Sequence, residues 1–250
     1  MYKTNRELTL DQRDMDLFEY LFSNKVALLH QINRDVFGNI PRVSMYRRLK
    51  RLDQNGFLAK QVFMLNSKPY QAISLSFNGF KKYLPKSEKG ELRTQIHSDS
   101  ITHDVQLLDI QNRFKRFEMV KEYFTENQIR SNADYGRIIL RDILEEINCD
   151  GVVKIKYPKF ESYVPIEYEL SQKSGKRYAD YLMEYYLNPK IFIVLYIAGS
   201  EELQKKLLAI SKRVGEKFEP KIFFTTYDKF MADSETVTST NHGGHQMILK

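Results

Sequence analysis

Three acidic residues in the middle of the chain have the types and the spacing of a metal site. Asp150 stands at the start of one β-like segment, 149–157, and Glu167 and Glu169 stand two residues apart in the next, 163–170. Side chains on a strand alternate in direction, so Glu167 and Glu169 share one face. If the two segments pair as a hairpin, Asp150 can approach that face. Three carboxylates at one place repel each other unless a divalent cation lies between them.

This arrangement predicts Mg²⁺ or Mn²⁺ as the cofactor, with Asp150, Glu167 and Glu169 as its ligands. It also predicts that at least one of the carboxyls takes up a proton more readily than a free carboxyl. The same residues are compatible with a simpler interpretation, an exposed hairpin face that carries ordinary surface acids.

The order Asp150, then Glu167-Tyr168-Glu169, resembles the metal-binding motif of the PD-(D/E)xK nuclease superfamily. That motif has an aspartate on one strand and an acid-x-lysine pair on the next. Here Cys149 precedes the aspartate in place of proline, and Glu169 stands where the lysine usually stands. The resemblance implies that Asp150, Glu167 and Glu169 are catalytic.

The resemblance further implies that Lys173 or Lys176 replaces the missing lysine, which would stabilise charge on the scissile phosphate. Glu126, directly after another β-like segment, resembles the additional upstream acid of several members. The missing lysine also leaves open a nuclease fold that has lost its catalysis.

The elements around the acids predict an α/β domain with a mixed sheet flanked by helices. Helices are expected over 98–117, 175–186 and 201–214, and strands over 119–125, 149–157, 163–170, 191–198 and 221–226. A nuclease-like domain is therefore expected over residues 98–230, and a flexible tail over 231–250, which begins with a Ser/Thr-rich stretch.

The first 86 residues predict a winged helix-turn-helix. Helices are expected after Thr9 or Asp11, over 25–37 and over 42–54, followed by β-like segments at 57–64 and 70–76. A charged connector follows at 87–97. The fold class is thus α+β, with a winged helix before the nuclease-like domain.

The net charge favours an acidic partner for this first part. Residues 1–97 hold 17 Lys and Arg against 9 Asp and Glu, a net charge of +8, whereas residues 98–250 hold 22 and 23, a net charge of −1. The third expected helix is rich in cations and short polar groups, which bind phosphates and read base edges in double-stranded DNA. The predicted DNA-binding residues are Arg42, Ser44, Tyr46, Arg47, Arg48, Lys50, Arg51 and Lys68. A solvated basic face is the alternative.

Composition narrows the class of protein further. The longest apolar run, 191–198, is too short for the roughly 20 residues of a membrane span, and no secretory signal is visible at the N-terminus. With a single cysteine, Cys149, an internal disulfide framework is excluded. We therefore expect a cytoplasmic protein that makes no membrane contact.

A winged helix followed by an acid-x-acid strand resembles the replication-relaxation family of plasmid and mobile-element proteins, over roughly residues 8–226. The resemblance implies a DNA-binding protein that acts in replication, relaxation or mobilisation, with other proteins of those processes as partners. An active Mg²⁺-dependent DNA endonuclease is the first alternative. A transcriptional regulator whose second domain senses a ligand or dimerises is the other, and a homodimer remains open.

Overall fold

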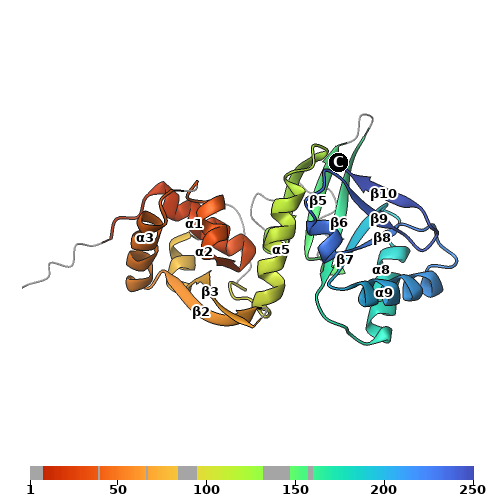
Figure 1. The fold of residues 1–250 in the computed structure, drawn as a ribbon, viewed down its shortest axis with the longest axis horizontal. Coiled ribbons are helices and arrows are strands. Elements are labelled where there is room, and N and C mark those ends of the chain that lie inside the picture. Colours follow the sequence, from red (N-terminus) through yellow and green to blue (C-terminus); the bar gives the residue numbers. More distant parts are fainter. Residues whose placement is uncertain (1–7, 39, 66, 84–94, 132–146, 157–159) are drawn as a thin grey trace, which may run out of the picture. The chain divides into compact units, whose positions relative to one another are not determined.

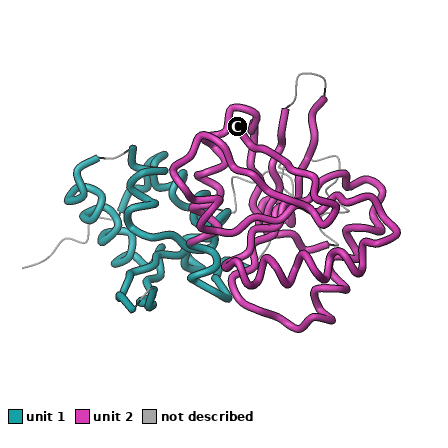
Figure 2. Tube along the Cα trace, turned by 45° about the vertical axis from the view of Figure 1, so that its right-hand side comes forward, with its two compact units in different colours: residues 1–105, 131–134 teal, residues 106–130, 135–250 magenta. Residues whose placement is uncertain are grey.

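The computed structural model describes residues 8–38, 40–65, 67–83, 95–131, 147–156 and 160–250, and its fold is α+β (Figure 1). The chain forms two compact units, residues 1–105 with 131–134 and residues 106–130 with 135–250 (Figure 2). The predicted connector at 87–97 lies largely outside the described residues. Among the helices of the described part, none has the length and apolar character that crossing a membrane requires.

The first unit contains helices and a small antiparallel sheet of strand order β1-β3-β2. Its elements are α1 (Gln12–Asn24), β1 (Val26–Leu28), α2 (Leu29–Asp35), α3 (Arg42–Gln54), β2 (Leu58–Leu65), β3 (Lys68–Leu75) and α4 (Phe77–Tyr83).

Local signals placed two of these helices correctly. Asp11 caps α1: its Oδ1 accepts from the backbone N of Asp14 at 3.0 Å, and Asp14 Oδ2 accepts from the backbone N of Asp11 at 2.9 Å. Helix α3 has the predicted bounds. It ends before Gly56, whose φ of +73° suits a residue without a Cβ.

The expected helix over 25–37 was partly wrong, because its first residues form strand β1. Lys25 has a φ of +62°, which turns the chain out of α1. Val26, Ala27 and Leu28 are then all buried, and Val26 pairs with Ser74 of β3. Three consecutive buried residues suit a strand that is covered on both faces, whereas a helix would expose one of them. Helix α4 was not predicted.

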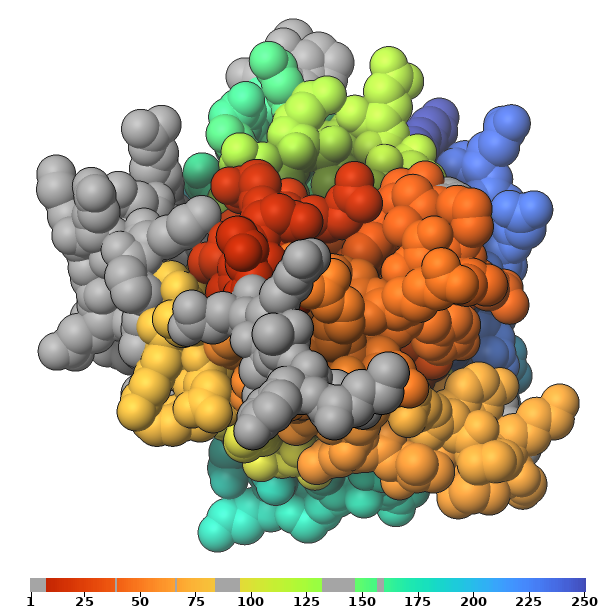
Figure 3. All heavy atoms as spheres, turned by 90° about the vertical axis from the view of Figure 1, so that its left-hand side faces the viewer, coloured from red at the N-terminus to blue at the C-terminus, as the bar shows by residue number. Residues whose placement is uncertain are grey.

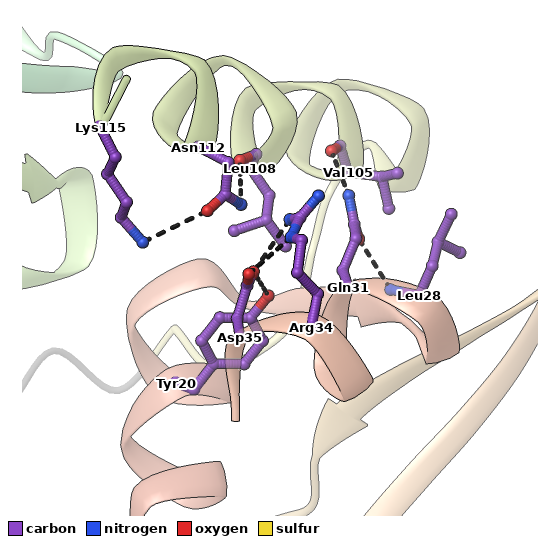
Figure 4. Close-up of polar contacts among 9 residues, drawn as sticks. All are labelled: Tyr20, Leu28, Gln31, Arg34, Asp35, Val105, Leu108, Asn112 and Lys115. Carbon is purple, nitrogen blue, oxygen red and sulfur yellow. Dashed lines mark hydrogen bonds and ion pairs between the residues drawn. The ribbon is translucent and has the colours of Figure 1, made fainter. Parts of the chain in front are cut away.

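The first turn of α5 (Ile101–Phe114) completes this unit. Val105, which is 1% exposed, packs with Val26, Leu28 and Ala72. The buried Gln31 side chain links the same elements: its Oε1 accepts from the backbone N of Leu28 at 2.9 Å, and its Nε2 donates to the carbonyl O of Val105 at 3.0 Å (Figure 4). The unit therefore extends beyond the predicted boundary at residue 86.

The second unit is built on a curled mixed sheet of strand order β10-β9-β8-β7-β6-β5-β4. The pairs β6–β7 and β7–β8 are parallel and the others are antiparallel. Its remaining elements are β4 (Val120–Thr125), α6 (Glu126–Ile129), β5 (Gly151–Lys156), β6 (Glu161–Glu169), α8 (Gly175–Leu187), β7 (Val194–Ala198), α9 (Glu201–Val214), β8 (Ile222–Thr226), α10 (Tyr227–Met231), β9 (Val237–Thr240) and β10 (Gln246–Leu249).

Helices cover both faces of this sheet, as the sequence predicted. One buried cluster joins the sheet to Leu182 of α8 and Leu207 of α9. The other joins it to Phe114 of α5 and Phe230 of α10. Alternation along β5 sends Val152 to the first cluster and Val153 to the second, which fixes the face that each residue of the neighbouring β6 presents.

The end of the chain is not a flexible tail. Residues 237–249 form β9 and β10 at one edge of the sheet, with Val237 and Leu249 buried. The turn between these strands is tied to the helices, because His242 Nδ1 lies 3.0 Å from Tyr186 Oη and 3.2 Å from Ser211 Oγ. Burial, followed by the nearby charges of Lys212 and His245, lowers the pKa of His242.

Candidate functional site

The predicted DNA-binding residues on α3 divide into two groups. Ser44 and Tyr46 are exposed, and four cations, Arg42, Arg47, Lys50 and Arg51, are exposed as well. None of these four cations forms an ion pair within the part of the chain that the structure describes. Because the apolar positions Met45, Leu49 and Leu52 are buried, the periodicity of the helix turns the cations toward solvent. Lys68 is exposed at the start of β3.

Arg48 differs from the other cations of α3, because its side chain contacts residues at the start of α1. Its Nε donates to Asp14 Oδ1 at 2.8 Å, its Nη2 pairs with Asp14 Oδ2, and the same Nη2 donates to the carbonyl O of Thr9 at 3.0 Å. The Asp14 side chain is 1% exposed and that of Arg48 is 19% exposed. Hydrogen bonding to Asp14 raises the pKa of Arg48. Arg48 thus joins α3 to the start of α1, and this ion pair occupies the guanidinium that the sequence assigned to DNA.

The wing-like hairpin β2–β3 contributes one free cation to this face. Lys68 makes no ion pair among the described residues, whereas Lys60 on β2 pairs with Asp53 of α3 at 2.6 Å. In Figure 3 the lighter orange hairpin projects beside the orange surface of α2 and α3. The basic face therefore combines the exposed side of α3 with the outer end of the hairpin.

The three predicted metal ligands lie next to one another on β5 and β6, but each has a protein partner. The register that pairs Gly151 with Ile166 brings Asp150 opposite Glu167. Asp150 accepts from the backbone N of Tyr168 through Oδ2 at 2.8 Å, and its own backbone N donates to Ile166 O at 3.1 Å. The Asp150 side chain thus continues the hydrogen bonding of β5 beyond the end of that strand.

Glu167 and Glu169 share one face of β6, as predicted, and this face is turned toward α8. Tyr185 Oη of α8 donates a hydrogen bond to Glu167 Oε1. The Glu169 side chain is 6% exposed and pairs with Lys173 Nζ at 2.8 Å. Of the two candidate lysines, Lys173 therefore reaches the acids, whereas Lys176 is exposed on the first turn of α8.

The surroundings of Glu167 favour its protonated form, in the direction that the sequence predicts. Burial, followed by the negative charge of Asp150, raises the pKa of Glu167 well above its usual range. The hydrogen bond from Tyr185 and the charge of Lys173 oppose this shift, and Glu169 adds to it. Burial, followed by the charge of Glu167, also raises the pKa of the Cys149 thiol. Cys149 is therefore an inert buried thiol at neutral pH.

Two further residues border the acids. Glu126, the candidate upstream acid, begins α6 and lies 3.2 Å from Arg130 Nε through its Oε1. The Tyr123 hydroxyl is buried without a hydrogen-bond partner in the described part of the chain and lies so close to Gly151 that a Cβ there would overlap it. A glycine at this position is what allows the close approach.

These residues do not yet amount to a metal centre. Within the described residues, no three His, Cys, Asp or Glu side chains converge in a way that could hold a metal ion. Each of Asp150, Glu167 and Glu169 instead has a protein donor on one oxygen. A Mg²⁺ or Mn²⁺ ion at this place would have to displace these donors or bind the remaining carboxylate oxygens.

Sequence reasoning missed a cavity in the first unit, whose lining includes Asn33 of α2, Tyr46 of α3 and Tyr70 of β3. No local pattern could have indicated it, since the three elements meet only in the folded unit.

Comparisons of the chain with protein-family models, with curated proteins and with solved structures gave no match.

Proposed function

We propose that the protein binds double-stranded DNA through its first unit, with α3 as the recognition helix of a winged helix-turn-helix. One observation carries the proposal: the exposed side of α3 presents four cations that no acid of the described chain neutralises, namely Arg42, Arg47, Lys50 and Arg51. Guanidinium and ammonium groups that point into solvent are available to phosphates and to guanine edges. The exposed Lys68 on the hairpin supplies a further phosphate contact beside them.

The order of elements supports this assignment. Helices α1, α2 and α3 precede the hairpin β2–β3, and β1 adds a third strand to that hairpin. A recognition helix followed by an antiparallel ribbon offers a groove-reading element and a second element that contacts the backbone. A role in replication, relaxation or mobilisation of a mobile element, with partner proteins of those processes, rests on the family resemblance alone.

Fluorescence anisotropy with a labelled duplex of mixed sequence, at two salt concentrations, tests the proposal. Arg47→Ala should weaken binding to every sequence and flatten the salt dependence by about one unit if the residue contacts a phosphate. Lys82→Ala removes an equal charge from the exposed face of α4 and should leave affinity nearly unchanged. Equal affinity for wild type, Arg47→Ala and the double variant Arg47→Ala/Lys50→Ala would refute the proposal.

A Mg²⁺-dependent endonuclease is the second candidate function, and the placement of Asp150 opposite Glu167, with Glu169 on the same face of β6, is the observation that favours it. Crowded carboxylates of this kind are a common feature of phosphoryl-transfer sites. Incubation of supercoiled plasmid with Mn²⁺ or Mg²⁺ should then give nicked product, and Asp150→Asn should abolish nicking while retaining DNA binding. Absence of nicking with retained DNA binding would remove this candidate and leave the first.

A further inference from the structure

The first unit contains a cavity of about 330 Å³ between α2, α3 and the start of β3. Its apolar lining includes Leu28 and Met45, which are buried at 4% and 1% exposure. A volume of this size lies at the lower end of the range for small-molecule sites, roughly 300–1,000 Å³. The cavity lies in the unit that carries the basic face. Among the predicted DNA-binding residues, Arg42 and Tyr46 belong to its described lining.

Two aromatic rings line the cavity from different elements. Tyr46 of α3 is 45% exposed and Tyr70 of β3 is 37% exposed, although both are large and mainly apolar. Exposed aromatic rings beside an apolar floor favour a planar ring as the ligand, since planar rings stack on them with little loss of conformational freedom.

The polar groups of the lining specify the rest of the ligand. Arg42 is the charged group at the cavity, and no Asp or Glu is among the described residues that line it. A negatively charged substituent on the ligand would therefore meet a cation without a competing acid. Asn33 adds a second requirement. Its amide side chain belongs to the cavity lining, and an amide both donates and accepts, so it suits a ligand with a polar edge.

From these features we propose that the cavity binds a single nucleotide. A nucleobase combines a planar ring with N–H donors on its edge, and its phosphate is the anionic substituent. The phosphate pairs with Arg42, the base stacks against Tyr46 or Tyr70, and the polar edge of the base hydrogen-bonds to the amide of Asn33.

The nucleotide can come from two sources. One is an unpaired nucleotide that has left the stack of a bound duplex, and this source rests on the proposed DNA binding. The exposed Arg47, Lys50 and Arg51 on α3 would hold the flanking strand. The other source is a free mononucleotide, which needs no DNA binding.

The experiment compares, with the full chain, a labelled 20-base-pair duplex and the same duplex carrying one extrahelical nucleotide. Stacking of one base should make the bulged duplex bind about 5- to 150-fold more tightly. Calorimetric titration with each of the four deoxynucleoside 5′-monophosphates measures the free source directly.

Asn33→Leu is the decisive variant, because it removes the amide from the cavity lining while keeping a side chain of similar size, and it should keep the thermal stability of the unit or raise it. It should abolish the preference for the bulged duplex or the binding of mononucleotide. Arg42→Gln should weaken either interaction, and Lys82→Gln, which removes one charge outside the cavity, should not. Circular dichroism establishes that each variant is folded.

The outcomes separate the two proposals. A bulge preference that depends on Asn33 supports the cavity with DNA as the source, and Asn33-dependent binding of a mononucleotide supports it with the free source. Equal binding of both duplexes, together with no mononucleotide binding, overturns the nucleotide site and leaves DNA binding intact. Mononucleotide binding without any duplex binding retains the site and refutes the proposed function.

Discussion

Replacing Arg48 by alanine should destabilise the first unit far more than replacing its neighbour Arg47. The Asp14 carboxylate would lose both of its hydrogen bonds from Arg48 and keep only the one from the backbone N of Asp11. The Asp14 side chain is 1% exposed, so water replaces the lost guanidinium donors poorly. Removing one member of a buried ion pair costs about 3–5 kcal/mol.

Partial exposure of Arg48 places the expected cost at the lower end of that range, because solvent already screens one side of the pair. A loss of about 3 kcal/mol corresponds to a fall of roughly 12–24 °C in the melting temperature of a domain of about 100 residues. Arg47 is exposed and makes no ion pair within the described chain, so Arg47→Ala should change stability by at most about 0.5 kcal/mol.

Differential scanning calorimetry of the full chain measures the melting temperature of both variants. Fluorescence anisotropy with duplex DNA measures their DNA affinity. Arg47→Ala should lose DNA affinity at unchanged melting temperature, whereas Arg48→Ala should lose melting temperature. The double variant Asp14→Leu/Arg48→Met, which removes both charges, should recover much of the lost stability. If Arg48→Ala melts within 2 °C of wild type, the interpretation of this ion pair as structural is refuted.

Four further predictions concern titration, metal binding and unit boundaries. The pKa of Glu167 is raised in the folded state, so the protonated carboxyl stabilises the fold. This contribution is fully present below about pH 4.5 and is lost as pH rises through the raised pKa. Glu167→Gln should flatten this pH dependence and raise the melting temperature at pH 7. Addition of Mn²⁺ should raise the melting temperature of wild type but not of Glu167→Gln if a metal binds there, and an unchanged wild-type value would eliminate the metal site. The folded pKa of His242 is lowered, so the unfolded chain binds that proton more readily and stability should fall as pH drops through about 6.5; an equal fall in His242→Gln would contradict this assignment. A fragment of residues 1–105 should be more stable than one of residues 1–86 by at least about 2 kcal/mol in urea denaturation, because the shorter fragment lacks the buried Val105; equal midpoints would show that the unit ends earlier.

Elements whose signals are local could be predicted from the sequence. The bounds of α3 and α9 were predicted to the residue, because apolar periodicity lies within each segment and Asn55-Gly56 directly follows α3. The pairing of β5 with β6 was likewise predicted from two neighbouring strands and the turn between them. Sequence alone also placed Glu167 and Glu169 on one face, since strand alternation needs no tertiary information.

Features that depend on distant segments were decided only by the tertiary structure. The polar composition of residues 231–242 suggested a flexible tail, yet β9 pairs with β8 and His242 reaches Tyr186. Strand β1 could not be distinguished from a helix because its partner, β3, follows more than 40 residues later.

The role of each charged residue was likewise a tertiary matter. Arg47 and Arg48 are adjacent and chemically identical, and only the packing of α3 on α1 brings Asp14 to one of them. Asp150 was predicted from its residue type as a metal ligand, whereas the end of β5 gives it the backbone N of Tyr168 as a partner. Composition and spacing determine which groups are available for binding or catalysis. Burial and long-range contacts decide which of them are already satisfied by the protein and which remain available to a ligand.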